Sequence, residues 1–450
     1  MDFQTFRQFV ADEAAALRIE AYELYYQLGE STSVSAFRHE INKFSDASEG
    51  GVCLRCLVDG RMGYASTQLL SEESARALVR RAADNAAVLE SDQPEFLVSA
   101  GQSYQSVAVN DAPLPPADAL RKAALVGQDA LYAQSGVVDG SETKVFAEHT
   151  RIAIHNSLGL DLQYENTAAG AFLSAVVSDG TEGGEKANDY KSCLGELDKL
   201  DLDASAREAA DSARASLGAG VAPTGAMPVV FSPKAMSQLL GTYAKVFSAE
   251  NAQKGLSLLK DKEGTVIASP AVTLVDDPFY EKSAMPMPFD AEGSPTCRKN
   301  VIENGTLNTL LYNLRTAAAA GKATTGNASK ESYDAQVEIQ PFTMYLASGE
   351  LTREQLLEKA GNGVLIDFLG GLHAGANTIS GDFSLQSAGF LIENGKKTAP
   401  VRSFTVAGNF FSLLKGITAV ADDPQPPTFP SPTAFVSPSV LVEGLSIAGK

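Results

Sequence analysis

Few side chains in this 450-residue sequence could build a metal or acid–base centre, since it holds only four histidines. His39-Glu40 begins like the zinc-protease motif, in which two histidines and a glutamate share one helix. No second histidine follows in residues 41–44, and the surrounding pattern is that of a strand. His149 and His155 share a strand face but are six residues apart, which is roughly 20 Å. Neither place is therefore expected to hold a metal ion.

The fourth histidine lies in a glycine-rich loop. His373 falls within residues 371–377, a segment that ends with Asn377 and is followed by Asp382. An imidazole, an amide and a carboxylate in one loop could cradle a ligand, although a lone loop histidine is weak support for a site. We take His373, Asn377 and Asp382 as the candidate binding residues.

The cysteines point to structural roles. Cys53 and Cys56 have the spacing of a redox or zinc motif, but they fall in a strand-like run from 51 to 58. Residues three apart on a strand point to opposite faces, so the two sulfurs should diverge. Cys193 and Cys297 are distant in the sequence, and a cytoplasmic chain would keep all four reduced.

Paired acids occur in two turn-like segments. Asp276-Asp277 forms one pair, and Asp290 with Glu292 forms the other. The residues 290–295 are typical of a turn whose carboxylates accept backbone N–H bonds. A calcium or glycosidase site is the functional alternative, but the chain has no tryptophan to stack on a sugar. The run 321–326 resembles a phosphate-binding loop only superficially, because its glycine spacing is wrong.

Length, charge and hydropathy narrow the class of protein. A 450-residue chain should form two or three domains. The formal charge of -19 argues against a nucleic-acid groove and weakly favours a basic or unfolded polypeptide partner. No apolar run is long enough to cross a bilayer, and no signal peptide is recognisable. We therefore expect a cytoplasmic protein that binds neither nucleic acid nor membrane.

The segment 228–257 is expected to lie at the centre of the largest domain. Residues 228–231 form an apolar strand, Ser232 is placed to cap a helix, and Pro233 suits its first position. One apolar stripe follows at spacings of three and four: Met236, Leu239, Leu240, Tyr243, Val246 and Phe247. This core helix carries no histidine, no cysteine and no acid before Glu250.

Two small α+β units are expected before that segment. Residues 1–110 contain a helix to about residue 17, a strand at 21–28 and a long half-exposed strand at 33–44. A turn at 45–51, a hairpin around Asp59-Gly60 and a helix capped by Ser71 complete this unit. Residues 111–225 begin with a proline-rich linker and contain helices at about 117–134 and 203–217, with strands between them.

The third unit, residues 226–450, is predicted to be a large, mainly antiparallel β domain. Asn304-Gly305 and Asn394-Gly395 are hairpin turns, and a helix is expected at 352–360. Residues 424–438 hold six prolines and cannot form a central strand. The segment 439–447 could be an edge strand. The fold class is therefore α+β.

Several turn segments, taken together, resemble the TldD/PmbA family. They are 275–278, 289–293, 302–305, 325–327, 380–384 and 407–409, and the run 59–65 is similar to the family's first domain. Any one is unspecific, but six in the right order over the whole chain are a strong resemblance. Members are often called modulators of DNA gyrase. The resemblance implies a two-subunit cytoplasmic zinc metalloprotease that acts on unfolded or flexible peptides.

The resemblance also implies which branch this is. The TldD branch carries His-Glu-x-x-x-His on a helix and a distal cysteine ligand, whereas the PmbA branch, also called TldE, lacks them. The matching positions here are Gly241, Thr242 and Val246, none of which can bind zinc or act as a base. The distal cysteine has no counterpart after Cys297. We therefore expect no catalytic residues and no cofactor in this chain, with zinc only in a TldD-like partner.

Three functions remain open at this point. The first is a non-catalytic subunit that pairs with a TldD-like protease and encloses peptide, with the strand 33–44 either accepting peptide by strand addition or paired within its own sheet. The second is a stand-alone homodimeric peptide-binding protein. The third is an enzyme with unrelated chemistry around His373 and Asp382. A dimer should use residues beyond about 226, and the segment 424–438 lies either in that interface or against its own domain.

Overall fold

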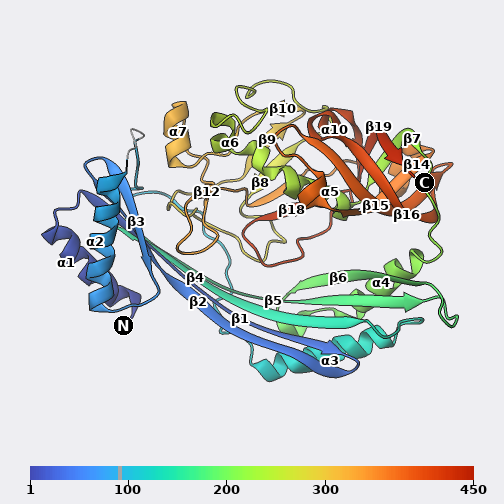
Figure 1. Ribbon diagram of the computed structural model, residues 1–450, viewed down its shortest axis with the longest axis horizontal. Helices are drawn as coiled ribbons and strands as arrows, with labels where there is room; N and C mark the ends of the chain where they lie inside the picture. Colours follow the sequence, from blue (N-terminus) through green and yellow to red (C-terminus); the bar gives the residue numbers. More distant parts are fainter. Residues whose placement is uncertain (90–93, 450) are drawn as a thin grey trace.

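The structure is a computed structural model that describes residues 1–89 and 94–449. The sequence predicts no regular structure for residues 91–116, and residues 91–93 of this segment lie outside the described residues. Figure 1 shows a long curved sheet with its helices, and a second body of strands and helices that lies across the concave side of this sheet. The predicted α+β class is confirmed.

The N-terminal part is built on one antiparallel sheet with strand order β3-β2-β1-β4-β5-β6. Its strands are β1 (Ala21–Phe37), β2 (Glu40–Val58), β3 (Arg61–Thr67), β4 (Glu142–Asn156), β5 (Asp161–Ser178) and β6 (Lys186–Gly195). β1 and β4 pair over the length from Glu23↔Asn156 to Phe37↔Glu142. The strands of both predicted N-terminal units thus form one continuous sheet.

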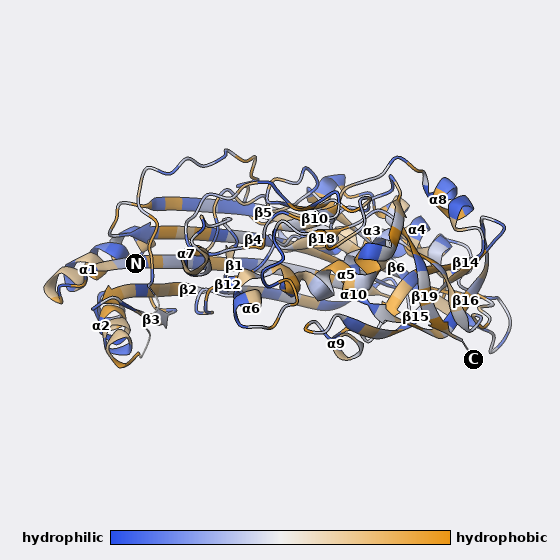
Figure 2. Ribbon diagram, turned by 90° about the horizontal axis from the view of Figure 1, so that it is seen from above, coloured by the Kyte–Doolittle hydropathy of each residue, from blue (hydrophilic) through white to orange (hydrophobic). Residues whose placement is uncertain are grey.

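Four helices cover one face of this sheet. They are α1 (Phe3–Ala16), α2 (Glu72–Val88), α3 (Ala117–Tyr132) and α4 (Leu202–Ala215), with a short 3-10 turn η1 (Leu197–Lys199) before α4. α1 and α2 pack against Leu24, and α3 and α4 pack against Val34, which lies on the same side of β1. Figure 2 shows the resulting bands of apolar and polar residues along the strands. The other face, which holds Tyr25, is turned toward the C-terminal part.

Two sheets form the C-terminal part. The larger has the order β16-β15-β14-β7-β19-β17, and a further pairing of β16 with β19 closes it on itself. Its strands are β7 (Gly225–Phe231), β14 (Gly363–Gly370), β15 (Asp382–Glu393), β16 (Lys396–Asn409), β17 (Ile417–Val420) and β19 (Val440–Ala448). Only β7–β14 is parallel in this sheet, so the predicted mainly antiparallel architecture is confirmed.

The smaller C-terminal sheet has the order β10-β9-β8-β13-β18. Its strands are β8 (Leu274–Asp277), β9 (Lys299–Glu303), β10 (Thr306–Leu307), β13 (Thr343–Leu346) and β18 (Ala434–Val436), and a separate pair joins β11 (Ala328–Ser329) to β12 (Glu338–Ile339). The helices are α5 (Pro233–Tyr243), η2 (Ala244–Phe247), α6 (Ala249–Gln253), α7 (Leu314–Ala320), α8 (Arg353–Ala360), α9 (Leu372–Gly375) and α10 (Phe410–Gly416). None of the helices described is long and apolar enough to span a bilayer.

Helix α5 is buried in the largest hydrophobic cluster, as its apolar stripe predicts. The Ser232 side chain accepts a hydrogen bond from the Ala235 backbone N–H at 3.3 Å, and Pro233 occupies the first turn. Every residue of the predicted stripe belongs to that cluster. The α-helix is shorter than the stripe, however, because the chain tightens into the 3-10 helix η2 after Tyr243. Val246 therefore lies on η2.

The hairpins at Asp59-Gly60, Asn304-Gly305 and Asn394-Gly395 are confirmed. The prediction for residues 33–51 was wrong. β1 and β2 meet in a tight turn at Arg38 and His39, both with positive φ, and the predicted turn at 45–51 lies within β2. β1 is also paired on both sides, with β2 and β4. The backbone groups of residues 33–37 are thus satisfied within the sheet, which rules out strand addition there. Residues 40–44 belong to β2, which pairs with β3 only from Val52 to Val58, so strand addition along them stays a prediction.

Two predictions concerned the last 30 residues. The strand predicted as an edge at 439–447 is β19, which was wrong because β19 pairs with β7, β17 and β16. The proline-rich segment 424–438 contributes only the short edge strand β18, as its proline content predicts. Phe429 of this segment stacks on Phe146 of β4, with ring centroids 5.9 Å apart. The segment therefore contacts the N-terminal sheet of its own chain.

Candidate functional site

Gly241, the first position that the family resemblance matches to a zinc ligand, lies in the last turn of α5. A Cβ atom on Gly241 would lie 2.9 Å from Cδ2 of Phe435 and 3.2 Å from its Cε2. Real Cβ atoms do not approach so closely, so the Phe435 ring already occupies the space that a side chain at position 241 would need. Phe435 of β18 thus packs into the space that is left free because Gly241 has no side chain.

The other two matched positions are also unsuited to zinc. The Thr242 hydroxyl donates to the Gln238 carbonyl at 2.8 Å, and Val246 is an apolar residue of the core. Zinc in proteins is held by cysteine, histidine and carboxylate side chains. The residues present therefore do not fit a zinc ion at this place. Within residues 1–89 and 94–449, no three His, Cys, Asp or Glu side chains are grouped to share a metal.

The loop around His373 is organised by its own hydrogen bonds. Asn377 Oδ1 accepts from the backbone N–H groups of Ile379 and Ser380, at 2.9 and 3.1 Å. Asp382 accepts from Asn409 Nδ2 at 2.9 Å and from the Ser380 hydroxyl at 2.8 Å, and these bonds lower its pKa. His373 is exposed on the single turn α9. Asn377 and Asp382 shape the turn into β15, and a binding role for the three residues stays a prediction.

His39 and His149 lie at different places in the N-terminal sheet and contact different side chains. His39 is at the exposed β1–β2 turn, where its Nδ1 lies 2.8 Å from Asp129 Oδ1. His149 is buried beside Thr167, with Nδ1 2.6 Å from Oγ1. Cys53 and Cys56 belong to different hydrophobic clusters on opposite faces of the sheet, which confirms that their sulfurs diverge.

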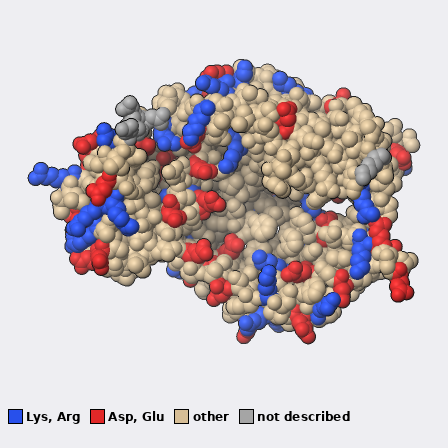
Figure 3. Space-filling view, in the orientation of Figure 1, with Lys and Arg blue, Asp and Glu red and all other residues tan. Residues whose placement is uncertain are grey.

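A cleft of about 650 Å³ lies between the N-terminal sheet and the C-terminal part. Its floor is the inner face of β1 and β4, with Tyr25, Gln27, Glu148 and Ile152. Its roof comes from residues 285–291, the β11–β12 pair and residues 430–433. Figure 3 shows the hollow between the two bodies of the molecule, with acidic side chains around it. Sequence reasoning missed this cleft, because its two walls are distant in sequence.

Of the two lysines that line the cleft, Lys245 of η2 lies 4.0 Å from Glu338, and Lys330 directly follows β11. The ammonium group of Lys330 lies 5.1 Å from the centroid of the Tyr25 ring, and burial lowers its pKa. No carboxylate of a described residue lies within 4.0 Å of its Nζ. On the floor, Glu148 has no described cation within 4.0 Å, and the Oε1 of Gln27 is buried without a hydrogen-bond donor. Three polar groups around one cleft thus have unused bonding capacity.

The acidic turn 290–295 closes one end of the cleft. Asp290 accepts backbone N–H bonds from Glu292, Ser294 and Ala328 at 2.9 to 3.0 Å, as the turn pattern predicts. Burial and the neighbouring Glu292 carboxylate raise the pKa of Asp290 to about 8, against the lowering effect of those bonds. Each oxygen of these two carboxylates accepts at least one bond from a protein donor, so the pair serves the turn and its contacts, and no group of three metal-ligating side chains is found among the described residues.

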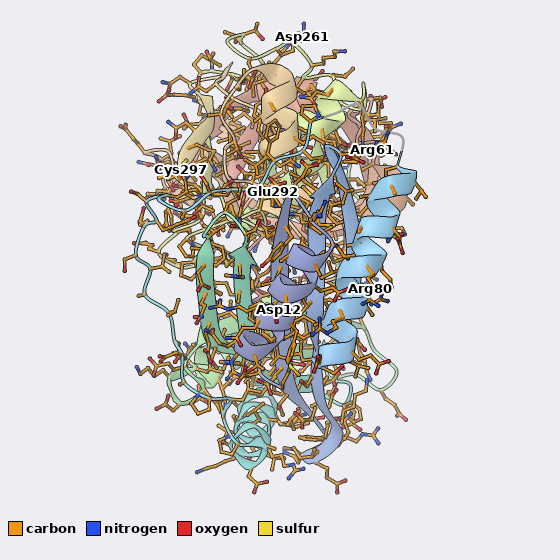
Figure 4. The ribbon with its side chains drawn as sticks, turned by 90° about the vertical axis from the view of Figure 1, so that its left-hand side faces the viewer. Asp12, Arg61, Arg80, Asp261, Glu292 and Cys297 are labelled. Atoms are coloured by element: carbon orange, nitrogen blue, oxygen red, sulfur yellow. The ribbon has the colours of Figure 1, made fainter. Side chains whose placement is uncertain are left out.

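Glu292 ties this turn to the N-terminal sheet. Arg55 Nε donates to Glu23 at 2.8 Å and Arg55 Nη1 donates to Glu292 at 3.3 Å, while the Leu314 N–H donates to the other oxygen of Glu292 at 2.9 Å. Figure 4 shows Glu292 where the strands of the first part meet the second. At the far end of the sheet, Lys234 of α5 donates to Asp189 of β6 at 3.0 Å. The cleft therefore lies between two polar contacts that join the N-terminal sheet to the C-terminal part.

Family models cover nearly the whole chain. The C-terminal domain model of the PmbA/TldA metallopeptidases matches residues 224–449, domain 1 matches 22–86, and the central domain matches 110–217. A metalloprotease of Methanothermobacter thermautotrophicus is 29% identical over 90% of this chain and 89% of its own length. The metalloprotease PmbA of Escherichia coli O157:H7 is 26% identical over 97% of this chain and 94% of its own.

Solved structures agree with these relatives. A Thermotoga maritima protein, described as a modulator of a DNA gyrase, matches with a TM-score of 0.89 and 29% identity over 99% of this chain and 100% of that one. TldE of Thermococcus kodakarensis matches with a TM-score of 0.85 over 99% of each chain, and at 24% identity this likeness concerns the fold. The resemblance inferred from the turn segments is confirmed, and the chain belongs to the TldD/PmbA metallopeptidase family.

Proposed function

We propose that this chain is a PmbA/TldE-like, non-catalytic subunit of a cytoplasmic TldD/TldE-type zinc metalloprotease that processes unfolded or flexible peptides. The observation that carries the proposal is the contact between Gly241 and Phe435. A zinc protease needs ligands and a carboxylate base on its helix, whereas α5 offers no side chain at the first position and fills that space with an aromatic ring. Zinc is expected only in the TldD-like partner.

The cleft supports a role in enclosing peptide. A hollow between an extended sheet and a second body can surround an extended chain, and the edge segments around β11 and β12 line it. Relatives named as metalloproteases make a peptide the ligand to test first. The subunit would then add surface to a shared chamber and leave bond cleavage to its partner.

The partner is proposed to be a TldD-like protease subunit, with a second copy of this chain as the alternative. The interface should be formed chiefly by residues beyond about 226, since this large β part matches the family's C-terminal domain and has no metal site of its own among the described residues. The segment 424–438 remains a candidate for it, because Phe429 is 56% exposed although it stacks on Phe146. The three domains at 1–110, 111–225 and 226–450 remain a proposed division.

The experiment is a pull-down of the tagged, full-length chain from its native host, with the bound proteins identified. We expect a TldD-like protease subunit in stoichiometric amount. A stable homodimer that binds peptide without that subunit would favour the stand-alone binding protein. Hydrolysis of peptide by the pure chain, lost on His373→Ala or Asp382→Asn substitution, would favour unrelated chemistry in that loop. A chain that is monomeric at micromolar concentration and recovers no partner contradicts the subunit role.

A further inference from the structure

The cleft between the two parts of the chain has the composition of a site for a charged but partly apolar ligand. Met285, Met287, Phe289 and Phe342 give it an apolar wall. Lys330 and Glu148 give it a cation and an anion with no ion-pair partner within 4.0 Å among the described residues, and Gln27 gives it an acceptor without a donor. Ligand sites of this size combine a mostly apolar lining with a few placed polar groups.

Lys330 is the anchor in this arrangement. A lysine ammonium that loses water without gaining a counter-ion within 4.0 Å is costly to bury, and here the face of the Tyr25 ring, the neighbouring Cys53 and the field of Glu23 compensate it only in part. A ligand carboxylate would complete the site, since charge-assisted hydrogen bonds are stronger than neutral ones. The Lys330 side chain therefore favours an anionic group in the cleft.

Gln27 narrows the choice of anion. It lies two residues beyond Tyr25 on β1 and so shares the inner face of the sheet, beside the ring that Lys330 covers. Its Oε1 is buried without a hydrogen-bond donor, and a rotation of the side chain would present it to a ligand N–H. The last residue of a peptide offers a carboxylate, a backbone N–H and a side chain together, which match Lys330, Gln27 and the methionine wall. An inorganic anion or an isolated carboxylate would match only Lys330.

Glu148 sets the direction of the bound chain. β1 and β4 pair Gln27 with Ile152 and Ser31 with Glu148, so Glu148 lies four positions further along the strands, at roughly 13 Å. An extended peptide of about four residues spans this distance. A basic side chain or a free amino terminus would then meet the Glu148 carboxylate.

We infer that the cleft binds the free C-terminal end of a short peptide with an apolar last residue, with its carboxylate on Lys330 and a positive group near Glu148. This inference rests on the proposed function, which makes peptides the ligands of the protein. It assigns a binding role to Lys330, Gln27 and Glu148 and requires no chemical step in this chain.

The test uses isothermal titration of the intact, isolated chain with the peptide Lys-Ala-Ala-Leu as a free acid and as a C-terminal amide. The amide should bind about 10- to 100-fold more weakly, because one charge-assisted contact is lost. Lys330→Met should abolish this preference, and Lys330→Arg should retain it. Lys396→Met, which removes an exposed lysine of β16, is the matched control and should leave the preference unchanged.

Several results would overturn the inference. They are no measurable binding of the free acid at millimolar concentration, equal binding of acid and amide, or an unchanged preference in a folded Lys330→Met variant. A peptide amide with an internal glutamate that binds as tightly as the free acid would assign the site to acidic side chains instead of chain ends. Circular dichroism of each variant checks folding. This titration needs neither a partner subunit nor zinc, so a negative result would contradict the peptide site and not the proposed subunit role. Conversely, zinc in the isolated chain would contradict the subunit role and not a measured preference for the free acid.

Discussion

Gly241 and Phe435 are complementary: the ring of Phe435 occupies the space over Gly241, with Cδ2 only 2.9 Å from the position of a Cβ atom. One residue lies on α5 and the other on β18, almost 200 positions later in the sequence. The pair joins the core helix to the edge strand of the smaller sheet. Gly241 is also the position that the family resemblance matches to the first zinc ligand.

The contact predicts a thermodynamic coupling between the two residues. Gly241→His should lower the free energy of unfolding by about 1–3 kcal/mol, because the core must repack around the new side chain. Phe435→Ala should also destabilise the chain by leaving a cavity. The double variant should lose less than the sum of the two, since removal of the ring makes room for the histidine.

The matched control for this cycle is Lys245→His, which puts the same side chain at an exposed position of η2. It should change the unfolding free energy by no more than about 0.5 kcal/mol. Urea unfolding followed by circular dichroism measures each value. Strict additivity of Gly241→His and Phe435→Ala would show that the two residues do not share space.

The ion-pair cluster of Arg55 should stabilise the docking of the two parts. Glu23, Arg55 and Glu292 are 1%, 4% and 3% exposed, so Arg55→Leu would leave two buried carboxylates without their cation. Breaking a buried pair in this way costs about 3–5 kcal/mol. Burial raises the pKa of Glu23, so the loss should be largest above that pKa and shrink as falling pH protonates the stranded carboxylates.

Arg207→Leu is the control for Arg55, because Arg207 is exposed on α4. Its effect on the urea midpoint should be small at every pH. If Arg55→Leu and Arg207→Leu shift the midpoint equally at pH 7, the cluster does not hold the two parts together.

Thiol reactivity offers a check on the N-terminal sheet. Cys297 is exposed, whereas Cys53 and Cys56 are buried on its two faces. Burial raises the pKa of Cys53 and raises that of Cys56 to about 11, so at pH 8 both are almost entirely unreactive thiols. Ellman's reagent should modify Cys297 first and all four cysteines alike in urea. Rapid loss of Cys53 or Cys56 in the native protein would contradict this placement.

Local signals predicted the local structure well. Ser232-Pro233 placed the start of α5, Asp59-Gly60 placed a hairpin, and the proline content of 424–438 excluded a central strand. One failure is local, because the β1–β2 turn lies at Arg38 and His39 and not at 45–51. The other failures concern pairing between distant segments. Nothing near Val34 or Val145 shows that β1 and β4 pair, and nothing near 439–447 shows that β19 is enclosed by three strands. Such pairings depend on the whole chain.

In the candidate site, too, local features were predictable from the sequence and tertiary contacts were not. The match of Gly241, Thr242 and Val246 to the zinc motif comes from the family resemblance and stays a prediction, whereas the turn chemistry of Asp290 was predictable from its sequence. Phe435 was recognised only as an apolar residue of a proline-rich segment, since its contact with Gly241 is tertiary. Lys330 and Gln27 carry no local motif at all. Their significance arises only where β1 and the residues after β11 face each other across the cleft.

Duplex DNA should not bind this protein at physiological salt. The formal charge of -19 leaves no surplus of Lys and Arg to replace counter-ions along phosphates. A fluorescence anisotropy titration with a labelled duplex should give no saturable binding at micromolar protein. Sub-micromolar binding that weakens steeply with salt would contradict this expectation and would favour a direct role in DNA transactions.

The most direct test of the central claim is the zinc content and peptidase activity of the chain, pure and then co-purified with its TldD-like partner. We predict no stoichiometric zinc and no hydrolysis of a flexible peptide for the pure chain, and one zinc per pair of subunits with hydrolysis for the complex. A chelator should abolish the activity of the complex. One tightly bound zinc per chain in the pure protein, together with chelator-sensitive hydrolysis, would contradict the account.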